Sequence, residues 1–133
     1  MLERRTLSRF ATALLAVYWL AMFIGTHWPT TPQFIHGNSD KIWHFFAYAG
    51  LGAMCSAAWA LSRPTILARL ALRHCLLIVL VVAVYGALDE ITQPLVGRSC
   101  ELLDWSADSL GACAGVAAVQ WLLLVAEKLL PQE

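Results

Sequence analysis

Most side chains that could do chemistry in this 133-residue chain are gathered in three regions, each beside a long apolar stretch. Carboxylates and imidazoles can transfer protons or bind divalent cations, whereas lysine and arginine can hold anionic groups such as phosphate. The acidic members are Asp40, Asp89, Glu90, Glu101, Asp104 and Asp108, and the basic members are His27, His36, Lys41, His44 and Arg98. A solvated surface would scatter these charges, so their grouping indicates a site.

The elements that must position these groups are four long apolar stretches. Hydrophobic residues make up 59% of the chain and charged residues only 14%, which is too apolar for an ordinary soluble domain. Stretches of about 17–25 apolar residues can cross a bilayer as helices. Here they cover residues 10–26, 42–61, 75–93 and 105–126, approximately. We therefore expect one domain over residues 1–133, an all-α integral membrane bundle of four transmembrane helices.

The basic residues predict how this bundle is oriented. Seven lie at the termini or between the second and third spans, namely Arg4, Arg5, Arg9, Arg63, Arg69, Arg73 and Lys128. Only Lys41 and Arg98 lie on the opposite side. By the positive-inside rule, both termini are expected in the cytoplasm, and segments 27–41 and 94–104 face outward. The expected location is the cytoplasmic (inner) membrane, in a multi-pass arrangement whose first span is not cleaved as a signal peptide.

The depth of Asp89 and Glu90 is the most informative detail. Fourteen residues separate His74 from Asp89, and they cover roughly 21 Å of a hydrocarbon core about 30 Å thick. The third helix must therefore continue to about Pro94, with both carboxyl groups on the order of 6 Å below the outer boundary. A charge at the centre of a membrane helix costs about 2.5–3.5 kcal/mol, and somewhat less here. Both acids therefore need partners, protons or water, unless they reach the lipid headgroups.

Helical spacing assembles these groups into one predicted site. Asp40 and His44 are four residues apart, as are Asp104 and Asp108, and Gln93 can share a face with Glu90. The predicted ligand-binding residues are Asp40, Lys41, His44, Glu90, Gln93, Arg98, Asp104 and Asp108. Simpler alternatives remain open at this stage. Asp40 and Asp104 could cap helix N-termini, Lys41 could extend to the headgroups, His44 could bind a backbone group, and Glu101 could be solvated.

Two further patterns concern packing and the classes of function that the sequence excludes. Small residues at four-residue spacing, Gly52-Ser56-Ala60 and Ala107-Gly111-Gly115, predict close packing of the second and fourth spans.

Nine basic and nine acidic residues give a net charge of zero, and no basic stripe is present, so nucleic-acid binding is not expected. The four cysteines lack the spacing of a zinc site or a disulfide framework. No resident metal or cofactor is predicted.

The polar segments resemble a known family. Asp40-Lys41-Ile42-Trp43-His44-Phe45-Phe46-Ala47-Tyr48, Tyr85-Gly86-Ala87-Leu88-Asp89-Glu90-Ile91-Thr92-Gln93, Gly97-Arg98, Asp104 and Gly111-x-x-x-Gly115 together resemble the VanZ-like family over residues 37–116. Its members are small bacterial membrane proteins named after a teicoplanin-resistance accessory protein. The resemblance implies functional roles for Lys41, His44, Glu90, Gln93, Arg98 and Asp104. One departure is Asp108, where the family pattern leads us to expect asparagine.

Two hypotheses of function follow, and a third is weaker. In the first, the site recognises an anionic envelope or glycopeptide-related ligand, with a role in glycopeptide resistance or envelope homeostasis. In the alternative, a membrane enzyme acts on a lipid-linked precursor, with Glu90, His44 or Asp104 as catalytic candidates or with a divalent metal. A proton relay ranks last because the inner halves of the spans contain no acid, lysine or arginine. The expected partners are the bilayer and this ligand, and a homo-oligomer is compatible with the sequence.

Overall fold

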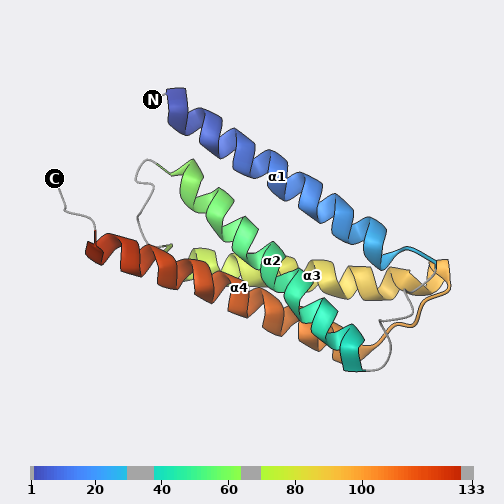
Figure 1. Ribbon diagram of the computed structural model, residues 1–133. Helices are drawn as coiled ribbons and strands as arrows, with labels where there is room; N and C mark the ends of the chain where they lie inside the picture. Colours follow the sequence, from blue (N-terminus) through green and yellow to red (C-terminus); the bar gives the residue numbers. More distant parts are fainter. Residues whose placement is uncertain (1, 30–37, 64–69, 130–133) are drawn as a thin grey trace.

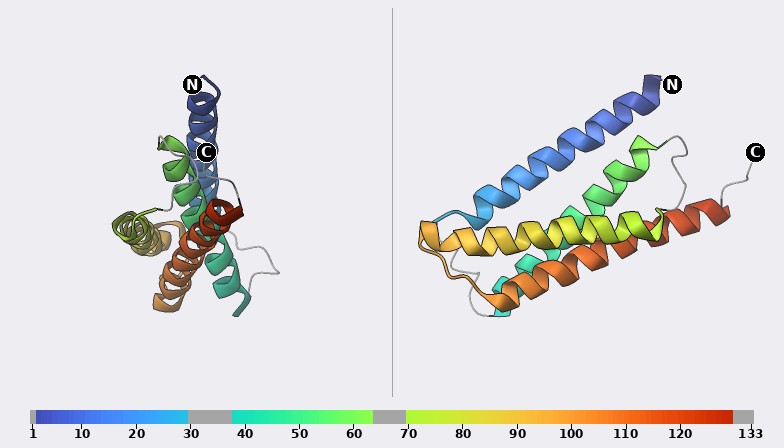
Figure 2. Two further views of the ribbon diagram at one scale, coloured as in Figure 1. Left: turned by 90° about the vertical axis from the view of Figure 1, so that its left-hand side faces the viewer. Right: turned by 180° about the vertical axis from the view of Figure 1, so that it is seen from behind.

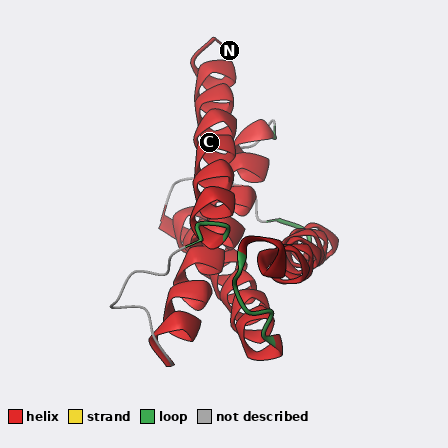
Figure 3. Cartoon of the chain, turned by 90° about the vertical axis from the view of Figure 1, so that its right-hand side faces the viewer, coloured by secondary structure: helices red, strands yellow, loops and turns green. Residues whose placement is uncertain are grey.

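The computed structural model describes residues 2–29, 38–63 and 70–129 of the chain, and in these ranges every regular element is helical (Figure 3). The four long helices are α1 (Leu2–Thr26), α2 (Asn38–Ser62), α3 (Leu72–Thr92) and α4 (Leu102–Leu129). A single 3₁₀ turn, η1 (Gln93–Val96), follows α3 directly. The all-α prediction is confirmed, and each predicted span lies within one of these helices or within α3 and η1.

All four helices are long and apolar enough to cross a membrane. The suitable stretches contain 22, 24, 25 and 28 residues, and about 20 apolar residues are enough for a hydrocarbon core of roughly 30 Å. Large apolar side chains point away from the bundle along every helix, among them Phe10, Phe46, Leu80 and Leu110. Such a surface is stable in lipid and unstable in water. The protein is therefore a multi-pass membrane protein with four spanning helices.

The tightest packing in the bundle joins α2 to α4, which cross in close contact along the middle of the molecule (Figure 1). A Cβ atom added to Gly52 would lie 2.7 Å from the Ala112 carbonyl oxygen. Cβ atoms on Gly111 and Gly115 would collide with the carbonyl oxygens of Phe45 and Ala49. Only glycine allows the two backbones to approach this closely. The predicted close packing of the second and fourth spans at these small residues is confirmed, with Gly52 against Ala112 and with Gly111 and Gly115 against the backbone of Phe45, Ala49 and Ala53.

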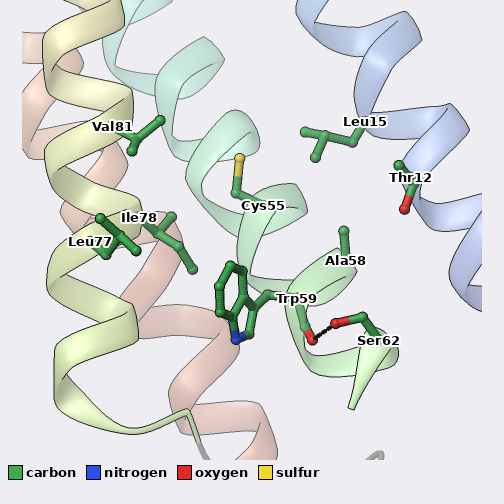
Figure 4. Close-up of a pocket in the computed structure, with 9 residues that line it drawn as sticks. All are labelled: Thr12, Leu15, Cys55, Ala58, Trp59, Ser62, Leu77, Ile78 and Val81. Atoms are coloured by element: carbon green, nitrogen blue, oxygen red, sulfur yellow. Dashed lines mark hydrogen bonds between the residues drawn. The ribbon is translucent and has the colours of Figure 1, made fainter.

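The helix α1 packs mainly on α2, at an angle to the rest of the bundle (Figure 2). The Tyr18 hydroxyl donates a hydrogen bond of 2.8 Å to the Ala47 carbonyl oxygen. The ring of Trp19 meets the ring of Tyr85 on α3 edge to face, with centroids 5.0 Å apart. Toward its start, α1 diverges from α3 (Figure 1). A hollow of about 330 Å³ opens there among apolar side chains of α1, α2 and α3, including Leu15, Cys55 and Ile78 (Figure 4).

The alternating directions of the helices bring four chemistry-bearing segments to one end of the bundle. The polar end, as we name it, is where α1 and α3 finish and where α2 and α4 begin (Figure 1). The α-helical part of α3 stops at Thr92, slightly before the predicted limit at Pro94. The reason is Pro94 itself, which has no N–H to continue the helical ladder. Gly97, with a φ of 81°, then turns the chain back over the site.

Candidate functional site

The centre of the polar end is a buried cluster of three ionisable side chains from three helices. His44 on α2, Glu90 on α3 and Asp108 on α4 are 6%, 2% and 0% exposed. The Nδ1 atom of His44 lies 2.9 Å from Asp108 Oδ1 and 3.8 Å from Glu90 Oε1. We call these three residues the inner group. A single imidazole nitrogen thus faces two carboxylates in a region shielded from water.

A second cluster lies at the rim of the polar end, and we call it the outer group. It consists of Lys41, Glu101 and Asp104. The Lys41 ammonium donates to Glu101 Oε2 at 2.9 Å and to Asp104 Oδ1 at 3.0 Å. The hydrogen bond from Lys41 lowers the pKa of Glu101 below its ordinary value. Lys41 therefore ties α2 to both the start of α4 and the loop before it.

Glu101 also joins the outer group to the inner group through its backbone. Its N–H donates a hydrogen bond of 2.9 Å to Glu90 Oε2. The sequence offered solvation as the simplest role for this loop residue, and its side chain is indeed 45% exposed, but its side chain and its backbone also bind site residues. The only signal in the sequence was its position just before the fourth span. The resulting contacts fix the loop over the buried carboxylate of Glu90.

Asp40 and Arg98 form a looser pair beside these two groups. The guanidinium Nη2 of Arg98 is 4.0 Å from Asp40 Oδ1, and Nη1 donates to the Gly25 carbonyl oxygen at 3.5 Å. Asp40 Oδ1 is in turn 3.9 Å from His44 Nε2. All three contacts are long for hydrogen bonds. Arg98 thus points into the site while most of its donors make no short bond to the described residues.

The end of α1 contributes Thr26 and His27, neither of which is among the eight predicted ligand-binding residues. Thr26 donates a hydrogen bond of 2.8 Å to Asp89 Oδ1, and His27 Nε2 lies 2.9 Å from the Thr92 hydroxyl. The Gln93 amide is within 3.3 Å of oxygen atoms on both Asp89 and Glu90. Asp89 and Glu90 are each 2% exposed. Their side chains are held inside the bundle and do not extend to the lipid headgroups.

Four buried polar atoms have no hydrogen-bond partner among the described residues: the hydroxyl oxygens of Tyr48, Tyr85 and Ser109, and Asp108 Oδ2. Of these four residues, Tyr48 and Asp108 have fully buried side chains. A Cβ atom on Gly86 would lie 3.1 Å from Asp108 Oδ2 and 3.2 Å from Tyr48 Cε1. The two side chains therefore meet at the same point of α3. Buried polar atoms are nearly always paired, so this pair calls for an explanation.

The eight predicted site residues all lie at the polar end, but in separate groups. His44, Glu90 and Asp108 come together, Lys41 binds Asp104, Gln93 contacts Glu90, and Asp40 lies between His44 and Arg98. No hydrogen bond or ion pair within the described residues joins Arg98 directly to Glu90 or Asp104. Asp40 and Asp104 lie in the first turns of α2 and α4, two residues inside each helix, so neither occupies the N-cap position.

These features define a class of protein: a small multi-pass membrane protein whose buried ionisable groups are gathered at one end of a four-helix bundle. A family model described as VanZ/LLP1 matches residues 4–124, and the chain therefore belongs to the VanZ/LLP1 family. The match agrees with the resemblance seen in the sequence and extends across the first span. Comparisons with curated proteins and with solved structures found no match.

Proposed function

We propose that this protein recognises an anionic group of a cell-envelope molecule or a glycopeptide-related ligand at its polar end. In this proposal the protein lies in the cytoplasmic membrane with both termini inside, so that the polar end faces outward. The distribution of basic residues supports this orientation, because six of those in the described segments lie toward the opposite end, namely Arg4, Arg5, Arg9, Arg63, Arg73 and Lys128. The role that follows is in glycopeptide resistance or in envelope homeostasis.

The observation that carries the proposal is the contrast between Arg98 and Lys41. Lys41 is committed to two carboxylates at 2.9 and 3.0 Å. Arg98 has five N–H donors in a planar fork, but its contacts are 3.5 and 4.0 Å long. Its side chain is 13% exposed and therefore within reach of a ligand at the rim. A phosphate or carboxylate would fit this fork in a bidentate manner.

Binding to protein in lipid nanodiscs tests the proposal. The ligands are a lipid phosphate, a lipid with a neutral headgroup and a glycopeptide, and the variants are Arg98→Ala, Arg98→Lys and Glu90→Gln. Losing a charged hydrogen bond costs about 1.5–3 kcal/mol, which corresponds to roughly a tenfold weakening or more for Arg98→Ala. Arg98→Lys should also weaken binding because a lysine is a point charge. Glu90→Gln should be tolerated better than Arg98→Ala.

The matched control is Arg73→Ala, because Arg73 is an exposed arginine at the start of α3, far from the polar end. We expect its binding to equal that of the wild type. Equal binding of every anionic ligand by the wild type and Arg98→Ala would remove the proposal. Binding that weakens equally in Arg73→Ala and Arg98→Ala would also count against it, because that pattern indicates general charge attraction.

A second candidate function is supported by the contact between His44 and Asp108. A histidine and a carboxylate 2.9 Å apart, beside the buried Glu90, are suited to general acid–base chemistry on a lipid-linked envelope precursor. Purified protein incubated with such precursors, with and without chelator, would test this alternative. Product formation that His44→Gln abolishes and Arg73→Ala leaves unchanged would favour the enzyme. Absence of any product under all these conditions would reject it.

A further inference from the structure

The charges of the inner group do not balance among the described residues. Glu90 and Asp108 are both buried, and within the described part of the chain neither has a lysine or arginine nitrogen within 4.0 Å. Their shared ion-pair partner there is His44, which can supply at most one positive charge. An uncompensated carboxylate in a low-dielectric region costs several kcal/mol. The inner group therefore requires a further positive charge, in the form of a proton or a bound cation.

The geometry of the inner group suits a cation. One donor atom from each of His44, Glu90 and Asp108 can be chosen so that all three lie within 4.8 Å of one another. Zinc–nitrogen and zinc–oxygen bonds of about 2.0–2.2 Å place neighbouring donors roughly 3–3.5 Å apart. The distances from His44 Nδ1 to the two carboxylates, 2.9 and 3.8 Å, lie on either side of this range. Small side-chain rotations would complete the three-donor arrangement.

A second observation concerns Tyr48, whose hydroxyl has no partner among the described residues and whose ring lies beside the inner group. Tyr48 is fully buried, and its ring is nearly parallel to the ring of His44 at a centroid distance of 6.4 Å. Its Cε1 atom and Asp108 Oδ2 both lie next to Gly86. A water molecule bound to a cation in the inner group could accept from Tyr48 and donate to Asp108 Oδ2. The ion and its water would thus satisfy both unpartnered atoms.

We propose that His44, Glu90 and Asp108 bind a divalent transition-metal cation, Zn²⁺ or Mn²⁺. An imidazole with two carboxylates fits these ions better than Mg²⁺ or Ca²⁺, which prefer oxygen ligands alone. His44 binds through Nδ1, and its Nε2–H then points toward Asp40, which lies 3.9 Å away. In many metal sites a carboxylate that accepts a hydrogen bond from the second histidine nitrogen orients the ring, and Asp40 would have to approach His44 Nε2 by about 1 Å to form that bond. The proposal does not depend on the identity of the organic ligand.

A competing arrangement uses Asp40, His44 and Asp104, whose donor atoms also lie within 4.8 Å of one another. Two observations favour the inner group. The carboxylate of Asp104 is already neutralised by Lys41 at 3.0 Å. Asp40 is less buried than any of the three residues of the inner group, with a side chain 23% exposed. A cation at His44, Glu90 and Asp108 would be better shielded from water and would neutralise carboxylates that have no other cationic partner among the described residues.

Metal binding by the full-length protein in detergent, with no lipid or glycopeptide ligand added, tests the proposal. Chelator-treated protein is titrated with Zn²⁺, Mn²⁺ and the spectroscopic probe Co²⁺, and bound metal is measured by mass spectrometry. We expect about one ion per chain and visible Co²⁺ absorption bands. The changes His44→Gln, Glu90→Gln and Asp108→Asn should each weaken binding by about tenfold or more. Asp104→Asn, the same chemical change one turn away on α4, should leave the affinity within about threefold of the wild type.

Several results would overturn the proposal. One is a wild-type protein that binds no more metal than a detergent blank. Another is loss of the ion in Asp104→Asn with retention in Asp108→Asn, which would assign the ion to the competing group. Since a variant could fail to fold, the thermal midpoint of the wild type alone provides a second measurement. It should rise on adding Zn²⁺ and fall on adding chelator, and a midpoint that does not respond to either would also reject the site.

Discussion

The contact between Gly111 and α2 controls both the stability of the bundle and the geometry of the inner group. In Gly111→Ala, the new methyl group would collide with the Phe45 carbonyl oxygen and lie 3.0 Å from the Ala49 backbone nitrogen. These atoms belong to a helix backbone and cannot rotate away as a flexible side chain could. The two helices must therefore separate locally by about 1 Å to restore ordinary van der Waals contact.

The magnitude follows from this separation. Overpacking a close contact typically costs about 1–3 kcal/mol, and we expect the upper part of this range because backbone atoms are involved. For a chain of this size, 1 kcal/mol corresponds to a change in Tm of about 4 °C, so Tm should fall by roughly 8–12 °C. Asp108 lies one helical turn before Gly111, and His44 is adjacent to Phe45. The contact of 2.9 Å between His44 and Asp108 should therefore lengthen beyond hydrogen-bond distance.

Thermal unfolding followed by circular dichroism in detergent measures this effect. Gly25→Ala is the matched control, because a Cβ atom there meets nothing within 4 Å. Alanine is favoured over glycine in a helix by about 0.5–1 kcal/mol, so this control should be neutral or slightly stabilising. If Gly111→Ala were as stable as Gly25→Ala, the close approach of α2 and α4 would not be a determinant of stability, and our reasoning about the site would fail with it.

Three further predictions test individual contacts. Thr26→Val removes the hydrogen bond of 2.8 Å to Asp89 Oδ1 and leaves that buried oxygen, within the described residues, only the 3.5 Å contact with His27 Nδ1, so stability should fall by about 1–3 kcal/mol; an unchanged Tm would contradict this role. Lys41 depresses the pKa of Glu101. The contribution of ionised Glu101 to stability is therefore present above its pKa in the unfolded state and is lost as the pH falls through its pKa in the folded state. On acidification below about pH 4.5, Glu101→Gln should show a smaller loss of Tm than the wild type. Gly97→Ala forces alanine to a φ of 81° and should cost about 1–2 kcal/mol in the same unfolding assay; equal stability would mean that the turn adapts.

Much of the fold could be predicted from the sequence because the signals are long. Four apolar stretches determine the number of spans. Because successive helices alternate in direction, the ends of segment 27–41 and of segment 94–104 all lie at the polar end. The predicted stripes that contain Gly52 and Gly111 lie on the contacting faces of α2 and α4. Spacing along a helix predicts which residues share a face, and a glycine on that face predicts a close neighbour.

The detailed pairing of the site could not be predicted in the same way. Whether Lys41 meets Asp104 or Glu90 depends on how α2 crosses α4 and α3, and no one-dimensional pattern contains crossing angles. The contacts of Thr26 with Asp89 and of Glu101 with Glu90 join residues more than ten positions apart through a helix end and a loop. Helix ends and loops lack the periodicity that predicts which residues share a helix face. Sequence reasoning therefore found the correct end of the bundle but not its internal arrangement.

The same glycine-mediated contact explains how a small membrane bundle can contain so many buried acids. The desolvation cost of a buried ion is repaid only when its partners are held in good geometry. His44 on α2 and Asp108 on α4 can meet at 2.9 Å because Phe45 and Ala49 lie directly against Gly111. In lipid there is no hydrophobic force to press helices together, so van der Waals packing of small residues must supply that attraction. A substitution that enlarges Gly111 should therefore perturb the inner group more than one that enlarges Gly115 or Gly52, because Gly111 is three residues from Asp108 along α4, whereas Gly115 is seven residues from Asp108 and Gly52 is eight residues from His44 along α2.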